Sequence, residues 1–181
     1  MYDIIFSYGS FVFVNSITGD LAMKIIVVAD THKDYKKYKA IVEKNSDADL
    51  FIHLGDGEHE FVDVKNEFPE KNFIFVQGNC DFGSYKTLEV VEAQGYRILC
   101  VHGHEYNVQG GLDALISEAK AHNCTIALYG HTHMYRSEHT DGVYLLNPGA
   151  VDSPRGKNKP SYGVININDA GKLTMNIVAI K

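Results

Sequence analysis

The sequence predicts an α/β domain, and three features carry this prediction. Short apolar runs typical of buried strands recur along the chain, beginning with Lys24-Ile25-Ile26-Val27-Val28-Ala29. Between such runs, apolar residues recur with helical spacing, as at Tyr35, Tyr38, Ile41 and Val42. Many of the runs end in glycine beside polar residues, as expected where the carboxyl ends of strands open onto a ligand site.

Composition supports one globular domain without a broad nucleic-acid surface. The chain has 181 residues, 45% of them hydrophobic and 22% charged, which suffices for one core. Its net charge of -6 argues against a surface that binds the phosphate backbone of nucleic acid, so we do not expect a nucleic-acid partner. A nuclease stays open as an alternative. No apolar run reaches the roughly 18 residues of a membrane span. The unpaired set Cys80, Cys100 and Cys124 favours a reducing, cytoplasmic location.

Residues 1–22 are expected to be a leader outside the domain, which then covers residues 23–181. The leader is apolar around Phe11-Val12-Phe13-Val14, but it carries Asp3 and no basic residue, which is wrong for an export signal. Met23 stands directly before the first predicted strand. We therefore expect translation to start at Met23 and the leader to be poorly ordered; an added edge strand is the alternative.

The remaining elements follow in order along the chain. A helix is expected after Asp30-Thr31-His32 and ending near Asn45, and another contains Leu112, Leu115, Ile116 and Ala119. The turn Asn168-Asp169-Ala170-Gly171 predicts a hairpin between the last two strands. Further apolar runs predict strands at 50–54, 72–76, 88–91, 96–101, 125–129, 143–146, 162–167 and 173–180.

Five strand ends carry residues that can bind metal ions. Carboxylate and imidazole ligands together suit Mn²⁺, Fe, Zn²⁺ or Ni²⁺ and need no thiolate. Asp and Asn also cap turns after strands, so each motif alone has a structural alternative; their recurrence favours a metal site. The motifs are Asp30-Thr31-His32, Gly55-Asp56, Gly78-Asn79-Cys80-Asp81, His102-Gly103-His104 and Gly130-His131-Thr132-His133.

In the order and the residue types of these motifs, the chain from Met23 to Lys181 resembles the calcineurin-like metallophosphoesterases, especially the small capless bacterial and archaeal phosphodiesterases. The resemblance implies two packed mixed β-sheets flanked by helices, an α/β/β/α sandwich, with two divalent ions at the strand ends. It implies that Asp56 bridges both ions and that manganese is the first expected metal, with iron, zinc or nickel as alternatives. The implied ligands are Asp30, His32 and His133 for one ion and Asn79, His102 and His131 for the other.

The resemblance also implies hydrolysis of a small phosphodiester by in-line attack of a metal-bridging hydroxide. Asp81 is expected behind the ligands, where it would orient one of them. His104 and Arg155 are candidates for phosphate contact or help to the leaving group, since the planar guanidinium suits phosphate.

Cys80 departs from the pattern of larger relatives, which carry a histidine after the asparagine. A thiol is a poor acid for a leaving alkoxide, so substrates with good leaving groups are expected. Because a eukaryotic retromer subunit uses the same fold for protein binding, a non-catalytic scaffold is the alternative from another functional class. The complete set of ligand residues favours retained chemistry, and association into a homo-oligomer is also open.

Overall fold

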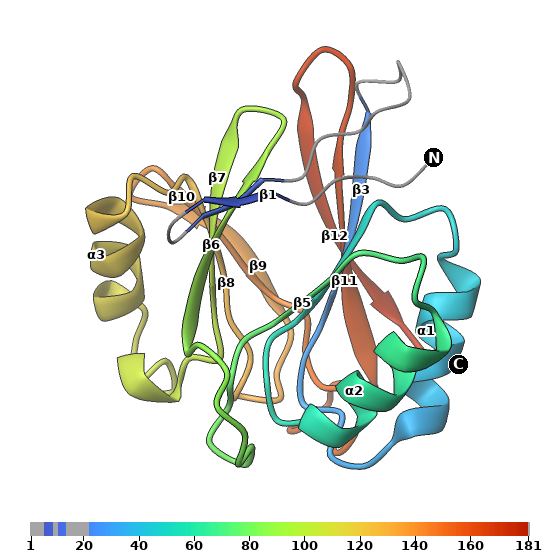
Figure 1. Cartoon of the computed structure of the whole chain (residues 1–181). Helices are drawn as coiled ribbons and strands as arrows, with labels where there is room; N and C mark the ends of the chain where they lie inside the picture. Colours follow the sequence, from blue (N-terminus) through green and yellow to red (C-terminus); the bar gives the residue numbers. More distant parts are fainter. Residues whose placement is uncertain (1–5, 9–10, 14–21, 181) are drawn as a thin grey trace.

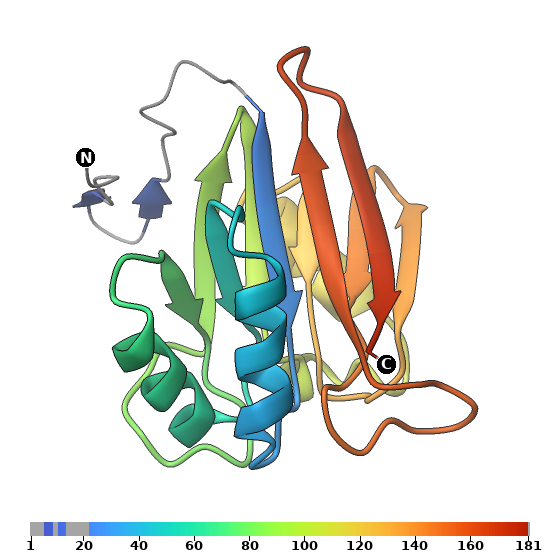
Figure 2. The same cartoon turned by 90° about the vertical axis from the view of Figure 1, so that its right-hand side faces the viewer.

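The computed structural model describes residues 6–8, 11–13 and 22–180, and in it two β-sheets pack face to face between helices (Figure 1). Figure 2 looks onto the outer face of the five-stranded sheet, with α1 and α2 in front of it. This is the α/β/β/α sandwich that the sequence and its family resemblance predict.

The five-stranded sheet has the order β12-β11-β3-β4-β5. Its three β-α-connected strands β3, β4 and β5 are parallel, so their carboxyl ends lie at one edge. The hairpin β11-β12 is antiparallel and joins β3 in antiparallel register. The bounds are β3 Met23–Val28, β4 Leu50–His53, β5 Phe73–Phe75, β11 Ser161–Ile167 and β12 Leu173–Ala179.

The seven-stranded sheet has the order β1-β2-β6-β7-β8-β10-β9. Strands β7, β8 and β10 are parallel to one another, while β6 pairs antiparallel with β7 and β9 pairs antiparallel with β10. The bounds are β1 Phe6–Tyr8, β2 Phe11–Phe13, β6 Leu88–Ala93, β7 Tyr96–Val101, β8 Ile126–Leu128, β9 Arg136–Thr140 and β10 Val143–Asn147.

Helices cover the outer faces of both sheets (Figure 1). Helices α1 (Tyr35–Lys44) and α2 (Glu58–Glu67) lie on the five-stranded sheet, and α3 (Asp113–Ala121) lies on the other. The side chain of Asp34 caps α1 by accepting the Lys37 N–H. A short 3₁₀ helix, His104–Tyr106, follows β7.

Three apolar layers hold these elements together. The central layer joins inward-facing side chains of both sheets, including Ile25, Ile52, Ile98 and Ile126, each fully buried. Two outer layers join the five-stranded sheet to α1 and α2 and the seven-stranded sheet to α3. Because burial of apolar side chains is the main stabilising term, the two sheets and their helices form a rigid support for the loops at the strand ends.

Two elements were not anticipated from the sequence. Helix α2 has a mostly polar sequence whose buried residues are only Glu60, Phe61 and Val64, so its apolar periodicity is weak. Strand β9 reads Arg-Ser-Glu-His-Thr and has no fully buried residue, because it lies at the sheet edge. The predicted hairpin around 168–171 is confirmed by the β11-β12 register.

Part of the leader is described. Strands β1 and β2 form an antiparallel pair, and β2 adds to β6 in parallel register at the sheet edge. This is the arrangement of the edge-strand alternative, while a translation start at Met23 stays a prediction. Residues 1–5, 9–10 and 14–21 lie outside the described part of the chain, so the expected disorder of the leader is not assessed there.

In the described ranges, none of the helices combines the length and the apolar character that crossing a membrane requires.

Candidate metal centre

The predicted ligand residues follow strands that end at one side of the sandwich. Asp30, Asp56 and Asn79 come after the parallel strands β3, β4 and β5, and His102 and the His131–His133 pair come after the parallel strands β7 and β8. Hydrogen bonds join the two groups of loops: His131 N donates to Asp30 Oδ2 at 3.1 Å, and His102 Nδ1 lies 2.7 Å from Leu54 O. The fold therefore brings these residues to one place.

One cluster of possible ligand atoms contains Asp30, His32 and His133. The two imidazole Nε2 atoms lie 3.2 Å apart, and His133 Nε2 lies 3.3 Å from Asp30 Oδ1. Asp30 is fully buried, and its Oδ1 has no hydrogen-bond partner among the described residues. A buried carboxylate oxygen without a partner is unfavourable, and a bound cation would stabilise it.

A second cluster contains Asp56, Asn79 and His102. His102 Nε2 lies 3.1 Å from Asn79 Oδ1 and 3.5 Å from Asp56 Oδ2. The same Asp56 Oδ2 lies 3.8 Å from His32 Nε2 in the first cluster. The Asp56 carboxylate thus lies near histidine nitrogens of both clusters.

Backbone carbonyls fix which nitrogen of two histidines faces the centre. His102 Nδ1 faces Leu54 O at 2.7 Å and His133 Nδ1 faces Ser153 O at 2.8 Å, and a carbonyl only accepts hydrogen bonds. In the neutral rings Nε2 therefore presents a lone pair to the carboxylate and amide oxygens. Ligand atoms that lie roughly 3 to 3.5 Å from one another can each lie at about 2.1 Å from one cation placed between them. The nitrogen and oxygen atoms of this centre therefore suit divalent metal ions.

His131 is placed differently from the other histidines. Its ring centroid lies 5.1 Å from that of His102, and its Nε2 lies 3.2 Å from Gln109 Nε2. It is absent from the groups of three described donors that lie within 4.8 Å of one another, whereas Asp30, His32, Asp56, His102 and His133 all belong to such groups. Gln109 was not singled out from the sequence, because a lone glutamine in a loop carries no metal signal.

The environments of His131 and His133 shift their pKa values in opposite directions. The carboxylate of Asp30 raises the pKa of His133, because the protonated ring is stabilised beside it. Burial, together with the neighbouring His102, lowers the pKa of His131. His131 is therefore held neutral, as a metal ligand must be.

The loops that carry the ligands adopt uncommon backbone conformations. Asp30, His32, Asp56, His131 and His133 have positive φ values of 54°, 40°, 59°, 67° and 57°. Non-glycine residues in this region cost on the order of 1 kcal/mol each, and such residues cluster at functional sites. Hydrogen bonds between neighbouring loops hold these conformations in place, such as His32 N–H to Asp56 O and Asp30 N–H to Gly55 O.

Asp81 holds the loop of Asp56 by its backbone. Its carboxylate accepts N–H groups from Asp56, Gly57, Glu58 and Gly78 at 2.8–2.9 Å. Burial raises its pKa, but the four backbone donors together outweigh this effect and lower the pKa. Asp81 therefore holds the peptide backbone around Asp56 and has no hydrogen bond to a histidine ring among the described residues.

Glycine is required where the Asp56 and Asn79 loops touch. A Cβ on Gly78 would lie 2.2 Å from Asp56 Oδ1 and 2.6 Å from Asp56 N. A Cβ on Gly55, which has a φ of 91°, would lie 2.6 Å from Gly78 N. The close approach also lets Cys80 N donate to Asp56 Oδ1 at 2.8 Å.

A series of buried hydrogen bonds supports the loops that carry Asp30 and Asp56. His53 Nδ1 accepts the Gly55 N–H, so Nε2 carries the proton toward Thr31 Oγ1 at 3.2 Å, and Thr31 donates to Glu60 Oε2. Burial lowers the pKa of His53 to about 4, which keeps the ring neutral.

Three further residues, His104, Arg155 and Cys80, lie around the clusters. The His104 ring is 5.4 Å from that of His102, and its Nδ1 is buried without a hydrogen-bond partner among the described residues. Arg155 donates its backbone N–H to His133 O, and its side chain is exposed. Cys80 Sγ lies within 4.8 Å of donor atoms of His32 and Asp56, and burial raises its pKa to about 11, so the thiol stays neutral.

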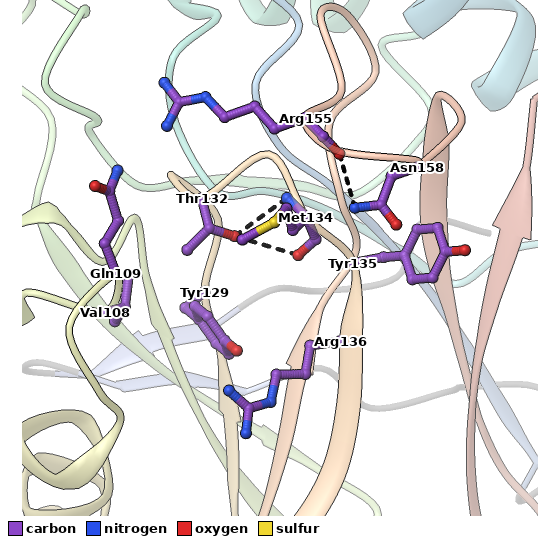
Figure 3. A pocket seen from close by; sticks show the side chains of 9 residues that line it. All are labelled: Val108, Gln109, Tyr129, Thr132, Met134, Tyr135, Arg136, Arg155 and Asn158. Carbon is purple, nitrogen blue, oxygen red and sulfur yellow. Dashed lines mark hydrogen bonds between the residues drawn. The ribbon is translucent and has the colours of Figure 1, made fainter.

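Several cavities border the clusters, and two of them differ in the charge of their linings. An arginine pocket of about 520 Å³, lined by the nine residues labelled in Figure 3, includes Arg136 and Arg155. An acidic cavity of about 260 Å³ is lined in part by Asp56, Glu58 and Cys80. Ligand atoms border both, because Gln109 and Arg155 of the arginine pocket contact His131 and His133, while His32 lines the acidic cavity.

Comparisons with protein families and curated sequences agree with this geometry. The family model of the calcineurin-like phosphoesterase superfamily domain matches residues 23–170. The chain is similar to the probable metallophosphoesterase YsnB of Bacillus subtilis, with 29% identity over 82% of this chain and 87% of that protein. It is also similar to the phosphodiesterase YfcE of Escherichia coli, with 25% identity over 85% and 93% of the two chains.

Solved structures show the same architecture. A predicted phosphoesterase of Streptococcus pneumoniae superposes with a TM-score of 0.77 at 25% identity, covering 87% of this chain and 90% of that chain. A structure of Vps29 from Entamoeba histolytica complexed with Zn²⁺ superposes with a TM-score of 0.68 at 22% identity, covering 86% and 98%. At that identity the Vps29 similarity concerns the fold alone.

Proposed function

The chain belongs to the calcineurin-like phosphoesterase superfamily, and from this membership and the geometry of its strand ends we propose that it is a metal-dependent phosphodiesterase. The observation that carries the proposal is the position of Asp56, whose Oδ2 faces His32 Nε2 at 3.8 Å and His102 Nε2 at 3.5 Å. A carboxylate between two sets of nitrogen and oxygen ligands is the arrangement that a pair of divalent ions requires.

The proposed ligand sets are the ones that the resemblance implies. Asp30, His32 and His133 would hold one ion, Asn79, His102 and His131 the other, and Asp56 both. Nitrogen and oxygen ligands without thiolate suit manganese, with iron, zinc or nickel as alternatives. When bound, such ions supply a water molecule of lowered pKa and positive charge for the phosphoryl oxygens.

Binding of His131 requires a local change. Its Nε2 now faces Gln109 Nε2 at 3.2 Å, and a ligand atom cannot keep that hydrogen bond. Gln109 would then be free to turn toward the arginine pocket that it also lines.

The surrounding residues have proposed roles in positioning and proton transfer. Asp81 positions Asp56 through its backbone N–H. His104 is the proposed proton donor to the leaving oxygen, because its Nδ1 is buried without a described partner beside His102 and because Cys80 is a neutral, weakly acidic thiol. Arg155 is the proposed phosphate contact. In the overall reaction, water forms a new P–O bond, the P–O bond to the alcohol breaks, and the alcohol leaves with one proton.

The two flanking cavities favour a phosphodiester over a monoester. A diester has two organic arms on one phosphorus, and a cavity lies on each of two sides of the ligand cluster. A monoester would use only one of them. The name of the similar YfcE, a phosphodiesterase, supports the same choice.

The proposal is tested by hydrolysis of bis(p-nitrophenyl) phosphate. Protein stripped with a chelator should be inactive, and activity should return with Mn²⁺. Asp56→Asn should lose metal-dependent activity, and His104→Ala and Arg155→Ala should lower turnover or substrate affinity. Absence of any metal-dependent product, with bound metal verified by elemental analysis, would contradict the proposal.

A non-catalytic scaffold is the second candidate, and the fold similarity to Vps29 favours it. Under this alternative the ligand residues would bind metal without hydrolysis, and the flanking surface would bind a protein. The same assay separates the two functions, because a scaffold with verified metal would release no p-nitrophenolate from either diester or monoester substrates.

A further inference from the structure

The arginine pocket differs in charge from the acidic cavity on the other side of the ligand cluster. Two guanidinium groups, those of Arg136 and Arg155, line the arginine pocket, and among the described residues no carboxylate lines it. The acidic cavity is lined by four carboxylates, those of Asp56, Glu58, Glu60 and Asp81, and by one ammonium group, that of Lys33. An anionic group on the substrate is therefore attracted to the arginine pocket, whose lining carries positive charge alone.

The same pocket offers aromatic and apolar surface. Tyr135 is 45% exposed and Met134 is 47% exposed, so two adjacent side chains present apolar surface at the pocket. Figure 3 shows Tyr129 between Thr132 and Arg136, with the ring of Tyr135 near Asn158. The volume of about 520 Å³ is in the range of small-molecule sites.

The floor of the pocket is already ordered. Thr132 Oγ1 accepts hydrogen bonds from Met134 N at 3.2 Å and from Asn147 Nδ2 at 3.1 Å, and the second of these bonds is buried (Figure 3 draws the first). Thr132 is itself buried. A ligand would therefore meet a preformed surface, which lowers the entropy lost on binding.

The pocket suits the arm that stays on the phosphate. Among the described residues, its lining has no carboxylic acid, imidazole or ammonium group that could protonate a leaving alkoxide. Burial also raises the pKa of Tyr129 to about 12. The proposed proton donor, His104, lies outside this lining.

From these observations we propose that the arginine pocket binds the retained arm of the phosphodiester and selects an arm with an aromatic ring and a second anionic group, as in a phosphorylated nucleoside. Arg136 is the proposed contact of the second anion, and Tyr135 is the proposed contact of the ring. Arg155 remains the proposed contact of the scissile phosphate, because its backbone is bonded to His133. This inference rests on the proposed phosphodiesterase function.

Three substrates with the same p-nitrophenolate leaving group test the proposal on the metal-loaded protein. They are methyl p-nitrophenyl phosphate, thymidine 5′-(p-nitrophenyl phosphate), and the latter compound with a 3′-phosphate. We expect kcat/KM to rise in this order, by about fivefold at each step, as for one partly exposed stacking or charge contact. Hydrolysis of the methyl ester without any rise would overturn the pocket assignment and leave the phosphodiesterase function intact. No hydrolysis of any of the three would contradict the function itself.

Matched variants assign the contacts. Arg136→Gln should remove the gain in kcat/KM from the 3′-phosphate, measured as the ratio between the two thymidine substrates within the same variant. Arg136 forms a surface ion pair with Glu138 at 2.8 Å. The variant Glu138→Gln breaks this ion pair but keeps the Arg136 cation, so it should retain the gain in kcat/KM from the 3′-phosphate. Equal loss in both variants, or no loss in Arg136→Gln, would overturn the role of Arg136.

A second pair of variants addresses the ring. Tyr135→Ala should reduce the gain from thymidine, whereas Tyr144→Ala should not, because Tyr144 is 38% exposed and stacks on His139 outside the pocket. A thymidine gain that survives Tyr135→Ala would overturn the aromatic contact.

Discussion

Asp56 faces the side of His102 that carries no proton in the neutral ring: Oδ2 lies 3.5 Å from Nε2, while Nδ1 is directed to Leu54 O at 2.7 Å. Two acceptors at this distance repel each other unless a cation lies near both. Since both residues are almost fully buried, water does not screen that repulsion well. The pair therefore indicates a site built for a cation rather than for internal hydrogen bonding.

Neutralising the carboxylate of Asp56 should weaken metal binding at both clusters. Asp56→Asn keeps the size of the side chain but loses its charge, so we expect the affinity for Mn²⁺ to fall by at least about tenfold, as for weakened ligation. Isothermal titration calorimetry measures this. The control is Asp49→Asn, whose carboxylate caps the Lys24 N–H away from the clusters. Unchanged affinity in Asp56→Asn would show that the two clusters do not share this residue.

A methyl group at Gly78 should displace Asp56. The Cβ of Gly78→Ala would overlap Asp56 Oδ1 and the Asp56 backbone N, and neither can move without breaking the hydrogen bonds to Cys80 and Asp81. We expect kcat/KM on bis(p-nitrophenyl) phosphate to fall by roughly 10²-fold, as for a misplacement of about 1 Å. Gly111→Ala is the matched control, because a Cβ there meets nothing within 4 Å. Equal activity of both variants would count against the close approach.

Replacement of Asp81 should destabilise the protein. In Asp81→Asn, the amide NH₂ would face backbone N–H groups that now donate to a carboxylate, so the free energy of unfolding should fall by roughly 3 kcal/mol. Because the folded protein lowers the pKa of Asp81 from 3.8, this stabilisation is present above about pH 3.8 and is lost as the pH falls through the lowered value. Urea unfolding of this variant and of Asp63→Asn, at an exposed position on α2, measures the difference; equal midpoints would contradict it.

Acid should destabilise the fold through His53. The folded state lowers the pKa of this buried histidine from 6.5 to about 4, so the unfolded state binds more protons between these values. The free energy of unfolding should therefore fall by about 2 kcal/mol between about pH 7 and pH 5 on account of His53. In His53→Gln this part of the pH dependence should disappear, whereas exposed His139→Gln should retain it. The same pH dependence in His53→Gln and the wild type would rule out this origin.

The sequence predicts the strands that support the centre because they are short, apolar and buried. It also predicts the ligand types, since Asp30, Asp56, Asn79 and the histidines stand directly after those strands. The backbone carbonyls that face His102 and His133, Leu54 O and Ser153 O, could not be predicted, because every residue type has a carbonyl group. Helix α2 and strand β9 were missed because few of their side chains are buried.

The arginine pocket also lay beyond sequence reasoning. Its residues come from separate segments around Gln109, Tyr129, Arg136 and Arg155, and only the packing of the sheets brings them together. Of the residues that line this pocket, the sequence singles out Arg155 alone, for its chemistry. Charge and shape of a cavity depend on contacts between distant segments, which a single sequence does not reveal.

The most direct test of the account is the position of bound metal. Crystals of the protein soaked in Mn²⁺ should show two anomalous peaks roughly 3.5 to 4 Å apart, one beside Asp30, His32 and His133 and one beside Asn79, His102 and His131, with Asp56 contacting both. A single peak, or two peaks of which Asp56 contacts at most one, would contradict the paired-cation centre.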